Sequence, residues 1–276
     1  MTLLAVSGLD LAARVRLAEQ VVRQVGREAL AFRERMGPLG LNVESKGLQD
    51  FVTVADRQAE ETIRQAIAAA FPDDCFIGEE SGGSSARGGV WVVDPIDGTT
   101  NYIRGFRHWG VSVAFVVAGE VELGAIYDAA QDKVYSAARG QGASKDGVPI
   151  HVSTGSDPSR AIAILGHSRR TDFDTYVEVA RQLYALGTDY RRMGAAAIGL
   201  VRVADGIGDL YYERHLFGWD MLAGALIAAE AGARVYLPPT DVAIARGGPI
   251  LVVAPGLDAS YGFLREKVVN ELRATR

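Results

Sequence analysis

The sequence predicts a mixed α/β protein, with an α+β first half over residues 1–152 and an α/β second half over residues 153–276. Two amphipathic helical segments followed by consecutive strands predict the first half. Short apolar strands that alternate with helices predict the second half, and this alternation favours a mixed or parallel sheet with helices on its faces. The chain has 276 residues, 48% of them hydrophobic, so it can bury a full-sized core.

Two helices are expected before the first strand. Ser7 followed by Asp10 resembles a capping box, and a long amphipathic helix is expected from there to about Met36. Its apolar positions recur at helical spacing, at Leu11, Val15, Ala18, Val22, Val25 and Ala29. A second helix is expected to start at Thr53 and to end before Pro72.

Four strand segments follow, at 75–77, 90–93, 111–117 and 121–127, each short and rich in β-branched or aromatic residues. Ala118, Gly119 and Glu120 predict a hairpin between the last two, so consecutive antiparallel strands are expected. The Gly- and Ser-rich segment 81–89 predicts a flexible, exposed loop.

The pattern changes near residue 153, where the segment 153–159 predicts a connection between the halves. Strands are then expected at 161–165, 209–212, 233–237 and 250–253. Helices are expected near 172–186, 194–204, 219–231 and 257–274.

Composition and charge narrow the class of protein. Lys plus Arg total 29 against 34 Asp plus Glu, and the formal net charge of −5 gives no general affinity for nucleic acid. A phosphate ligand would need a local cation to invert the potential. The single cysteine, Cys75, excludes an intrachain disulfide, and neither a signal peptide nor a membrane anchor is evident at the N-terminus. A cytoplasmic protein without membrane segments is therefore expected.

The segment from Trp91 to Asn101 carries the strongest chemical signal. An apolar strand leads into Asp94, a second carboxylate follows at Asp97, and Gly98 with Thr99 predicts the start of a short helix. Carboxylates at the end of a strand beside the free amides of a helix start suit a cation and a phosphate. A capped turn, in which both carboxylates bind nearby backbone amides, is the alternative for this segment taken alone.

Two further acidic sites support the cation. Glu79 and Glu80 follow another apolar strand, and Asp220 lies at the start of an apolar helix. Solvated glutamates and a helix N-cap are the alternatives for each site alone. Together these side chains supply the oxygen ligands that Mg²⁺ prefers, whereas no His or Cys pair has zinc-site spacing. Two such ions would polarise a phosphate and activate a water, which implies phosphoester hydrolysis.

Three motifs resemble those of the inositol monophosphatase family of magnesium-dependent, lithium-sensitive phosphatases. They are GEES at 78–81, WVVDPIDGTTN at 91–101 and WDMLAGALIAAEAG at 219–232, in the family's order, and similarity extends from about Lys46 to Val253. The resemblance implies the layered αβαβα sandwich of the sugar-phosphatase superfamily. It implies that the first half carries most metal ligands and the second half the leaving-group site. It also implies a homodimer.

The resemblance implies roles for individual residues. Two or three Mg²⁺ ions would be bound, the first by Glu79, Asp94 and the Ile96 carbonyl, the second by Asp94, Asp97 and Asp220, and a weak third near Glu79. Thr99 would orient the nucleophilic water together with Asp56, the aspartate of a T-x-x-D sequence that starts at Thr53. Asp56 can also be a capping-box residue of the second helix.

The same resemblance implies a substrate site made by Asp97, Gly98, Thr99, Ala196, Glu213 and Asp220. The Ala196 amide would donate to a substrate hydroxyl and Glu213 would accept from vicinal hydroxyls. Arg191 and Arg192 either add positive charge there or are solvated surface residues. Two departures, Ala195 and Phe217, lie on the leaving-group side and bear on the identity of the alcohol.

The expected reaction is direct attack of a metal-activated water on a phosphate monoester. Inositol 1-phosphate is the first choice of substrate, because Thr100 and Asn101 follow Thr99 as in inositol phosphatases. Histidinol phosphate and other small sugar or nucleotide phosphates are the alternatives within the superfamily. A catalytically silent phosphate-binding or regulatory protein is the alternative of another class. A role with RNA or in transcription receives no support from the acidic charge balance.

Overall fold

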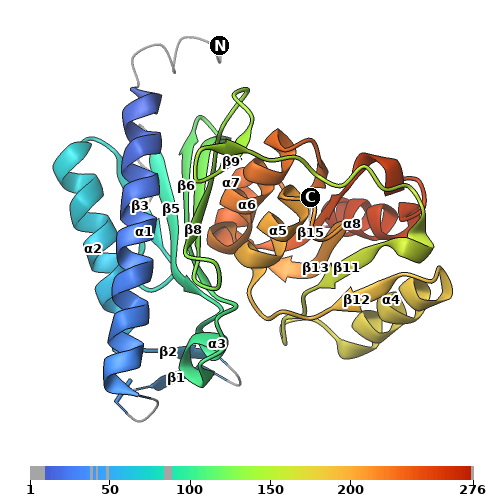
Figure 1. The fold of residues 1–276 in the computed structure, drawn as a ribbon, viewed down its shortest axis with the longest axis horizontal. Coiled ribbons are helices and arrows are strands. Elements are labelled where there is room, and N and C mark those ends of the chain that lie inside the picture. The colour runs from blue at the N-terminus through green and yellow to red at the C-terminus, as the bar shows by residue number, and fades with distance from the viewer. Residues whose placement is uncertain (1–9, 38–39, 42, 48–49, 84–88, 275–276) are drawn as a thin grey trace.

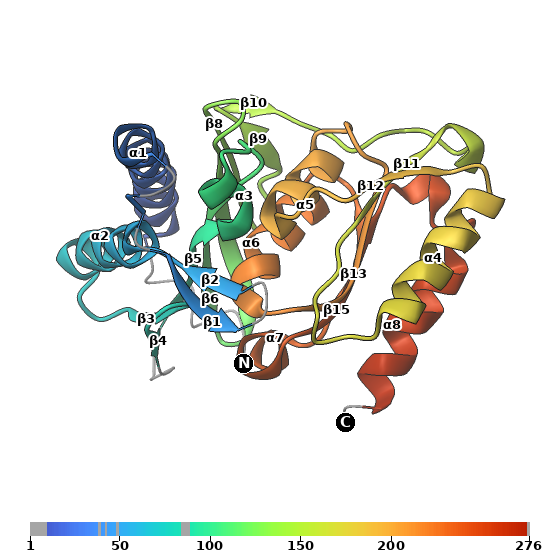
Figure 2. The same cartoon turned by 90° about the horizontal axis from the view of Figure 1, so that it is seen from below.

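Five layers, alternately helical and β-sheet, make up the computed structural model of the chain (Figures 1 and 2). The structure describes residues 10–37, 40–41, 43–47, 50–83 and 89–274. An outer pair of helices, a sheet of eight strands, a middle pair of helices, a sheet of five strands and a second outer pair of helices follow one another in space. This arrangement confirms the layered αβαβα sandwich.

The first outer layer consists of α1 (Leu11–Met36) and α2 (Val54–Ala70). The α1 helix ends where its apolar spacing predicts, but Asp10 itself is the N-cap, because its side chain accepts from the Ala13 amide at 2.8 Å. Ser7, the predicted cap, lies outside the described residues. The α2 helix starts with the predicted capping box of Thr53 and Asp56.

The larger sheet belongs to the first half of the chain and has the strand order β10-β9-β8-β7-β6-β5-β3-β4. Its strands are β3 (Cys75–Gly78), β4 (Gly82–Gly83), β5 (Val90–Asp97), β6 (Gly110–Val117), β7 (Glu120–Asp128), β8 (Lys133–Ala138), β9 (Ala143–Lys145) and β10 (Val148–Pro149). The short helix α3 (Thr99–Arg104) follows β5, and β1 (Glu44–Gly47) pairs with β2 (Asp50–Val52) in a separate two-stranded sheet.

Antiparallel pairing is confirmed from β5 through β8, including the predicted hairpin, whose turn residues Ala118 and Gly119 have φ of 51° and 84°. The expectation fails for β3, which pairs with β5 in parallel. The connection between these two strands passes through β4, which occupies part of the predicted loop 81–89. Residues 84–88 of that loop lie outside the described residues. The parallel pairing brings the ends of β3 and β5 to one edge of the sheet.

The smaller sheet belongs to the second half and has the order β12-β11-β13-β15-β14. It contains β11 (Ile162–Leu165), β12 (Asp189–Arg191), β13 (Leu210–Leu216), β14 (Arg234–Tyr236) and β15 (Gly248–Val253). Because β11 is parallel to both neighbours while β15 is antiparallel to β13, the sheet is mixed, as predicted. The pattern missed β12, which has only three residues, all of them exposed.

The remaining helices are α4 (Phe173–Ala185), α5 (Ala196–Ala204), α6 (Gly218–Glu230), α7 (Thr240–Arg246) and α8 (Gly262–Ala274), with 3₁₀ turns at Pro158–Arg160 and Pro255–Leu257. The α8 helix is shorter than the predicted 257–274, and α7 was not predicted. Figure 2 shows α4 and α8 on the outer face of the smaller sheet and α5 with α6 between the two sheets.

The α6 helix is buried nearly all round, as expected for a helix that lies between two sheets. Its apolar residues, such as Met221 and Leu222, belong to one core cluster with Ala114 of the larger sheet and Val252 of the smaller one. The two halves of the chain therefore share a core, and packing of α6 fixes where its first turn meets the larger sheet.

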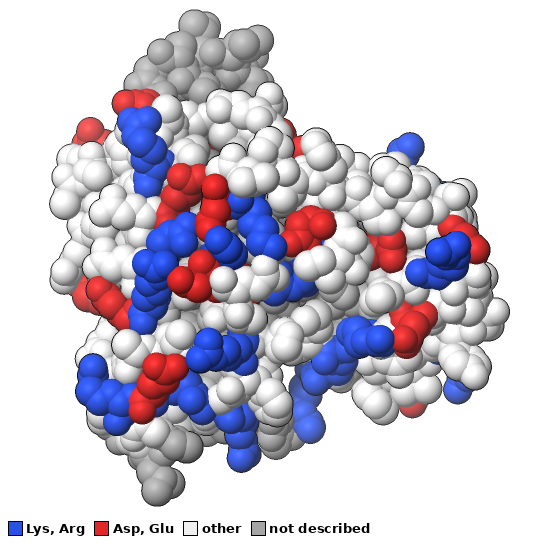
Figure 3. Space-filling model, in the orientation of Figure 1, with Lys and Arg blue, Asp and Glu red and all other residues white. Residues whose placement is uncertain are grey.

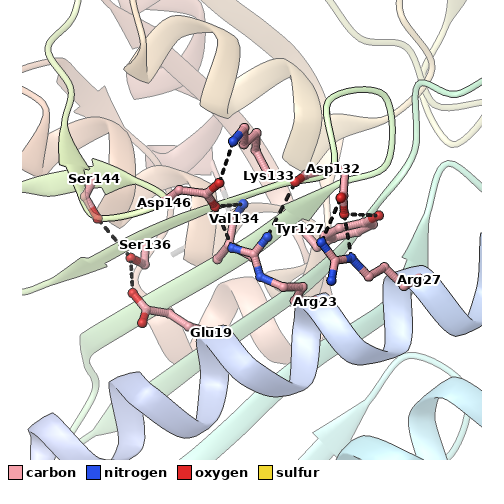
Figure 4. A network of polar contacts seen from close by, with 10 residues as sticks. All are labelled: Glu19, Arg23, Arg27, Tyr127, Asp132, Lys133, Val134, Ser136, Ser144 and Asp146. Carbon is pink, nitrogen blue, oxygen red and sulfur yellow. Dashed lines mark hydrogen bonds and ion pairs between the residues drawn. The ribbon is translucent and has the colours of Figure 1, made fainter.

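Polar side chains of α1 contact residues of the larger sheet and its turns (Figure 4). Arg23 pairs with Asp146 at 2.5 Å, Arg27 pairs with Asp132 at 2.7 Å, and the Ser136 hydroxyl donates to Glu19 at 2.6 Å. These contacts are mostly exposed, and each contributes little to stability.

The surface seen in Figure 3 carries basic and acidic side chains interspersed over α1 and the adjoining strands. Basic side chains gather at its lower edge, over the region of α3 and β12. Within the described residues, no helix combines the length and apolar character needed to cross a membrane.

Candidate functional site

The C-terminal end of β5 places two carboxylates inside the protein. Asp94 and Asp97 are 1% and 6% exposed, and the pairing of β5 with β6 shifts register between them. Gly98 then turns the chain into α3 with a φ of +88°, and a Cβ there would lie 2.9 Å from Ala195 Cβ. Glycine is required for this turn because both the backbone conformation and the close approach exclude a side chain.

Asp220, the third residue of α6, completes a group of three carboxylates. One carboxylate oxygen each of Asp94, Asp97 and Asp220 lies within 4.8 Å of the others. The Phe217 amide donates to Asp220 at 2.9 Å, so this side chain also caps α6. The buried Ser112 hydroxyl, opposite Asp94 in the sheet, donates to the Trp219 carbonyl at 2.9 Å and ties the first turn of α6 to β6.

The start of α5 holds Asp97 in place. The Ala196 and Ala197 amides donate to its two oxygens at 3.0 and 2.8 Å. No side chain of α5 caps these amides, because the N-cap residue is Ala195, so Asp97 takes that role from the other half of the chain. The Ala196 amide was expected to donate to a substrate hydroxyl. In the structure it already donates to Asp97, and a substrate would have to share it.

The three carboxylates repel one another. Burial, followed by the charges of Glu79 and Asp97, raises the pKa of both Asp94 and Asp220 well above the ordinary value. Burial raises the pKa of Asp97 to about 6, although its amide donors oppose the rise. Among the described residues, no Lys or Arg forms an ion pair with these carboxylates. A set of oxygen ligands, two buried and one half-buried, that lacks an internal cation fits Mg²⁺.

Glu79 lies at the end of β3, beside Asp94. Its amide donates to the Val93 carbonyl at 3.0 Å, and its carboxyl group is hydrogen-bonded to Asp94, whose pKa it raises. Glu79 is adjacent to the group of three rather than part of it. Its place as a ligand of the first ion therefore stays a prediction.

Glu60, which was not predicted from the sequence as a site residue, holds the turn that carries Glu79. The Glu60 carboxylate is 3% exposed and accepts from the amides of Glu80 and Ser81 at 2.9 and 3.1 Å. A Cβ at Gly78 would collide with this carboxylate. The signal was present, because Glu60 lies four residues after Asp56 and so on the same face of α2.

Asp56 and Thr99 come together as the resemblance implies, although 43 residues separate them. The Thr99 hydroxyl lies 3.3 Å from Asp56 Oδ1 and 3.1 Å from the Ile96 carbonyl oxygen. The other oxygen of Asp56 accepts from the Thr53 amide and hydroxyl at 2.8 and 2.6 Å. Burial raises the pKa of Asp56 to about 6, so the carboxylate is mostly ionised at neutral pH.

Asn101 joins the two halves beside this pair. Its Nδ2 donates to the carbonyls of His108 and Met193 at 2.6 and 2.8 Å. From the sequence alone, Asn101 indicates only the class of substrate. Its structural role leaves no local signal, because one of the two carbonyls lies 92 residues away.

Glu213, for which the resemblance implies contacts with the leaving group, belongs to β13, is 6% exposed and accepts a hydrogen bond from the Tyr211 hydroxyl at 2.6 Å. Burial raises the pKa of Glu213 to about 7. Arg191 pairs with Asp189 at 2.7 Å, which favours the solvated alternative for this arginine. The ring of Phe217 stacks on Trp219, with centroids 4.7 Å apart.

Comparisons with known proteins agree with this geometry. The chain is 34% identical over 223 residues to Nus factor SuhB of Escherichia coli K12, which covers 79% of this chain and 83% of the relative. The fold matches extragenic suppressor protein suhB of Bartonella henselae with a TM-score of 0.82 at 30% identity, covering 94% and 98% of the two chains.

The Thermotoga maritima IMPase matches with a TM-score of 0.81 at 28% identity, covering 94% of this chain and 99% of that chain. The model of the inositol monophosphatase family matches residues 11–271, nearly the whole chain. The chain, in which β5 and α6 bring together the acidic side chains of the family's motifs, belongs to the inositol monophosphatase family.

Proposed function

We propose that the protein is a Mg²⁺-dependent phosphate monoester hydrolase that acts on inositol 1-phosphate. The observation that carries the proposal is the convergence of the buried Asp94 and Asp97 with the half-buried Asp220 within 4.8 Å, all three with raised pKa values. Three neighbouring carboxylates without a compensating charge lower the stability of the fold, and a bound cation would offset that cost. Membership of the family supports phosphatase chemistry.

These three carboxylates, with Glu79 and the Ile96 carbonyl beside them, would hold the ions. Bound Mg²⁺ supplies positive charge that neutralises the phosphate oxygens and acidifies water. The chain itself positions that water. The Thr99 hydroxyl can donate its proton to the ionised Asp56, which leaves an oxygen lone pair to accept a proton from the attacking water.

The remaining groups bind the phosphate and the alcohol. The amide of the N-cap residue Gly98 and the first amide of α3, at Thr99, have no side-chain cap and can donate to phosphate oxygens. Glu213 can accept hydrogen bonds from two neighbouring hydroxyls of a polyol. In the reaction a water oxygen bonds to phosphorus, the bond from phosphorus to the alcohol oxygen breaks, and that oxygen takes a proton from a water oriented by Asp220.

Phosphate release from inositol 1-phosphate tests the proposal. With Mg²⁺ we expect turnover that EDTA abolishes, and Asp94→Asn or Asp220→Asn should lower kcat by at least about 10³-fold, because each variant removes a ligand of the ions. Asp241→Asn, the same change at an exposed position of α7, is the matched control. Circular dichroism should show that all variants fold. Full Mg²⁺-dependent activity in either site variant would refute the assignment.

A substrate panel separates inositol 1-phosphate from histidinol phosphate and from nucleotide and sugar phosphates. We expect the highest kcat/KM for inositol 1-phosphate among monophosphates, and inhibition by Li⁺.

We further propose a homodimer, which light scattering of the purified protein would test. If the protein is instead a catalytically silent binding protein, no phosphate should be released from any of these substrates, with or without chelator. The name Nus factor is that of the relatives. A corresponding role for this chain would require that it binds RNA with an affinity that falls as the salt concentration rises.

A further inference from the structure

The hairpin loop of residues 79–81 joins β3 to β4 and carries Glu79. At its base Gly78 pairs with Gly82, so the loop is short. The Glu79 amide donates to the Val93 carbonyl of β5 at 3.0 Å, which ties the start of the loop to the neighbouring strand. The two amides that follow need acceptors elsewhere.

Glu60 of α2 supplies both acceptors. Its two carboxylate oxygens accept from the Glu80 and Ser81 amides at 2.9 and 3.1 Å, and the residue is 3% exposed. A Cβ at Gly78 would collide with the same carboxylate, so the absence of a side chain there lets Glu60 lie directly against the backbone of β3. Every amide of the loop therefore has a partner outside the loop, and a rotation of the loop would break at least one of these hydrogen bonds.

Arg64 contacts the Glu60 carboxylate from the surface of α2. It lies one helical turn after Glu60, and its Nη2 lies 3.3 Å from Glu60 Oε1. The same nitrogen donates to the Ser81 hydroxyl, and the guanidinium carbon lies 4.2 Å from the ring centroid of Phe76 on β3. The carboxylate is thus held between the loop amides on one side and an arginine on the other.

The fixed loop directs Glu79 toward the acidic site. Because β3 is parallel to β5, with Gly78 opposite Val93, the next residues, Glu79 and Asp94, lie side by side. The carboxyl groups of Glu79 and Asp94 are hydrogen-bonded to each other. In metal sites, loss of a group that holds a ligand in place without touching the ion typically lowers metal affinity by roughly 10- to 100-fold.

We propose that Glu60 is a positioning residue of the Mg²⁺ site, which holds the loop so that the Glu79 carboxylate is oriented toward the ion. Glu60 itself would not contact the ion. The inference rests on the proposed Mg²⁺ site and adds to it a residue that lies outside the three sequence motifs. Asp56, one turn earlier on α2, lies 3.3 Å from the Thr99 hydroxyl, so one face of α2 would orient both the water-binding pair and a ligand of the ion.

A double-variant cycle on Mg²⁺ affinity tests the proposal. Isothermal titration calorimetry without substrate measures the half-saturating Mg²⁺ concentration of the wild type, Glu60→Gln, Glu79→Gln and the double variant. We expect Glu60→Gln to raise this concentration about tenfold, because its amide group cannot accept from both loop amides. In the Glu79→Gln background the same change should have no further effect, because Glu60 acts through Glu79.

Glu61→Gln is the matched control, since it makes the same change at the next position of α2, where the side chain is 57% exposed. Its half-saturating Mg²⁺ concentration should equal that of the wild type. Hydrogen exchange in EDTA follows the loop without any ion. The Glu80 and Ser81 amides should exchange faster in Glu60→Gln than in the wild type, whereas the Glu79 amide should keep its protection.

Circular dichroism shows whether Glu60→Gln folds. If it does not, Arg64→Gln takes its place in the cycle, and we expect a smaller rise of the half-saturating Mg²⁺ concentration, because only the outer partner of Glu60 is lost. An unchanged concentration in the variant used, an equal rise with and without Glu79→Gln, or unchanged exchange of the loop amides overturns this inference alone. Absence of Mg²⁺ binding by the wild type overturns the proposed function and this inference together.

Discussion

Carboxylates lie inside the protein at two places where α5 and α6 meet the larger sheet, one at Asp128 and one at Asp94, Asp97 and Asp220, and their charges are balanced in different ways. Asp128, at the end of β7, is fully buried and accepts a hydrogen bond from Arg202 Nη2 of α5 at 2.5 Å. Arg202 Nη1 also donates to the Tyr135 hydroxyl at 2.9 Å. Asp94 and Asp220 are surrounded by other carboxylates, and no described basic side chain pairs with them.

The difference distinguishes a structural ion pair from a binding site. A buried carboxylate needs a compensating charge, which the chain supplies to Asp128 through Arg202. At Asp94, Asp97 and Asp220 the chain supplies more negative charge instead, so the compensation has to come from a ligand. Removal of a charge is therefore expected to have opposite consequences in the two places.

Breaking the Arg202–Asp128 pair should have the largest effect on stability. Arg202→Met leaves the Asp128 charge buried without a partner, and we expect the free energy of unfolding to fall by about 3–5 kcal/mol. Urea denaturation followed by circular dichroism measures it. Asp128→Asn combined with Arg202→Met should recover part of the loss, because no lone charge remains. If Arg202→Met were as stable as the wild type, the buried pair would contribute no more to the free energy of unfolding than an exposed ion pair does.

Binding of Mg²⁺ should stabilise the group formed by Asp94, Asp97 and Asp220. At a free Mg²⁺ concentration about 100 times its Kd, the free energy of unfolding should rise by about 2.7 kcal/mol relative to protein in EDTA. The comparison uses urea unfolding with and without Mg²⁺. Asp220→Asn lacks one ligand and should show a smaller rise at the same concentration. Equal rises in both proteins would place the ion elsewhere.

Without Mg²⁺, the raised pKa values set the direction of the pH dependence. A carboxyl group whose pKa is higher in the folded than in the unfolded chain binds its proton more tightly when folded. Its contribution to stability is present below about pH 4, the ordinary value. It is lost as the pH rises through the folded value, which is about 6 for Asp97 and well above the ordinary value for Asp94.

Asp94→Asn removes one of these charges and keeps an oxygen that can accept from the Ile96 amide. In EDTA, thermal melts at pH 4 to 8 should show the wild type losing stability relative to this variant as the pH rises. Saturating Mg²⁺ should remove the wild type's disadvantage. A variant that is less stable than the wild type at pH 8 in EDTA would contradict the proposed repulsion.

An exposed ion pair gives the smallest expected effect and calibrates the comparison. Arg23, at 30% side-chain exposure, pairs with Asp146, which keeps a second partner in Lys133 at 2.8 Å (Figure 4). Arg23→Met should therefore lower the free energy of unfolding by at most about 1 kcal/mol. Urea denaturation in parallel with Arg202→Met provides the measurement. A loss as large as that of Arg202→Met would mean that burial does not separate the two kinds of pair.

Local patterns predicted most of the elements that build the layers. The apolar spacing that begins at Leu11 predicts α1 with its end at about Met36, where the helix ends, and the turn at Ala118 and Gly119 predicts the β6–β7 hairpin. The parallel pairing of β3 with β5 was missed, because strand direction depends on the path of the connection and not on the strand itself. The exposed β12 carries no alternation that would distinguish it from a loop.

The site shows the same division. Asp94, Asp97, Asp220, Asp56 and Thr99 were all named from the sequence, and the three aspartates of the cluster and the Asp56–Thr99 pair are found together in the fold. Ser112 and Glu60 were missed, since their partners lie on other elements. The use of the Ala196 amide by Asp97 could not be foreseen either, because 99 residues separate the two.

The sequence by itself determined most of the elements, though not β12 or α7, and which acidic residues stand at their ends, because helix caps, strand patterns and tight turns depend on neighbours in the chain. Only the tertiary structure decided that carboxylate oxygens at the end of β5 and in the first turn of α6 lie within 4.8 Å of one another. Packing of α6 between the two sheets fixes that distance, and with it the repulsion among the carboxylates. The need for a cation follows from this contact, which no local segment contains.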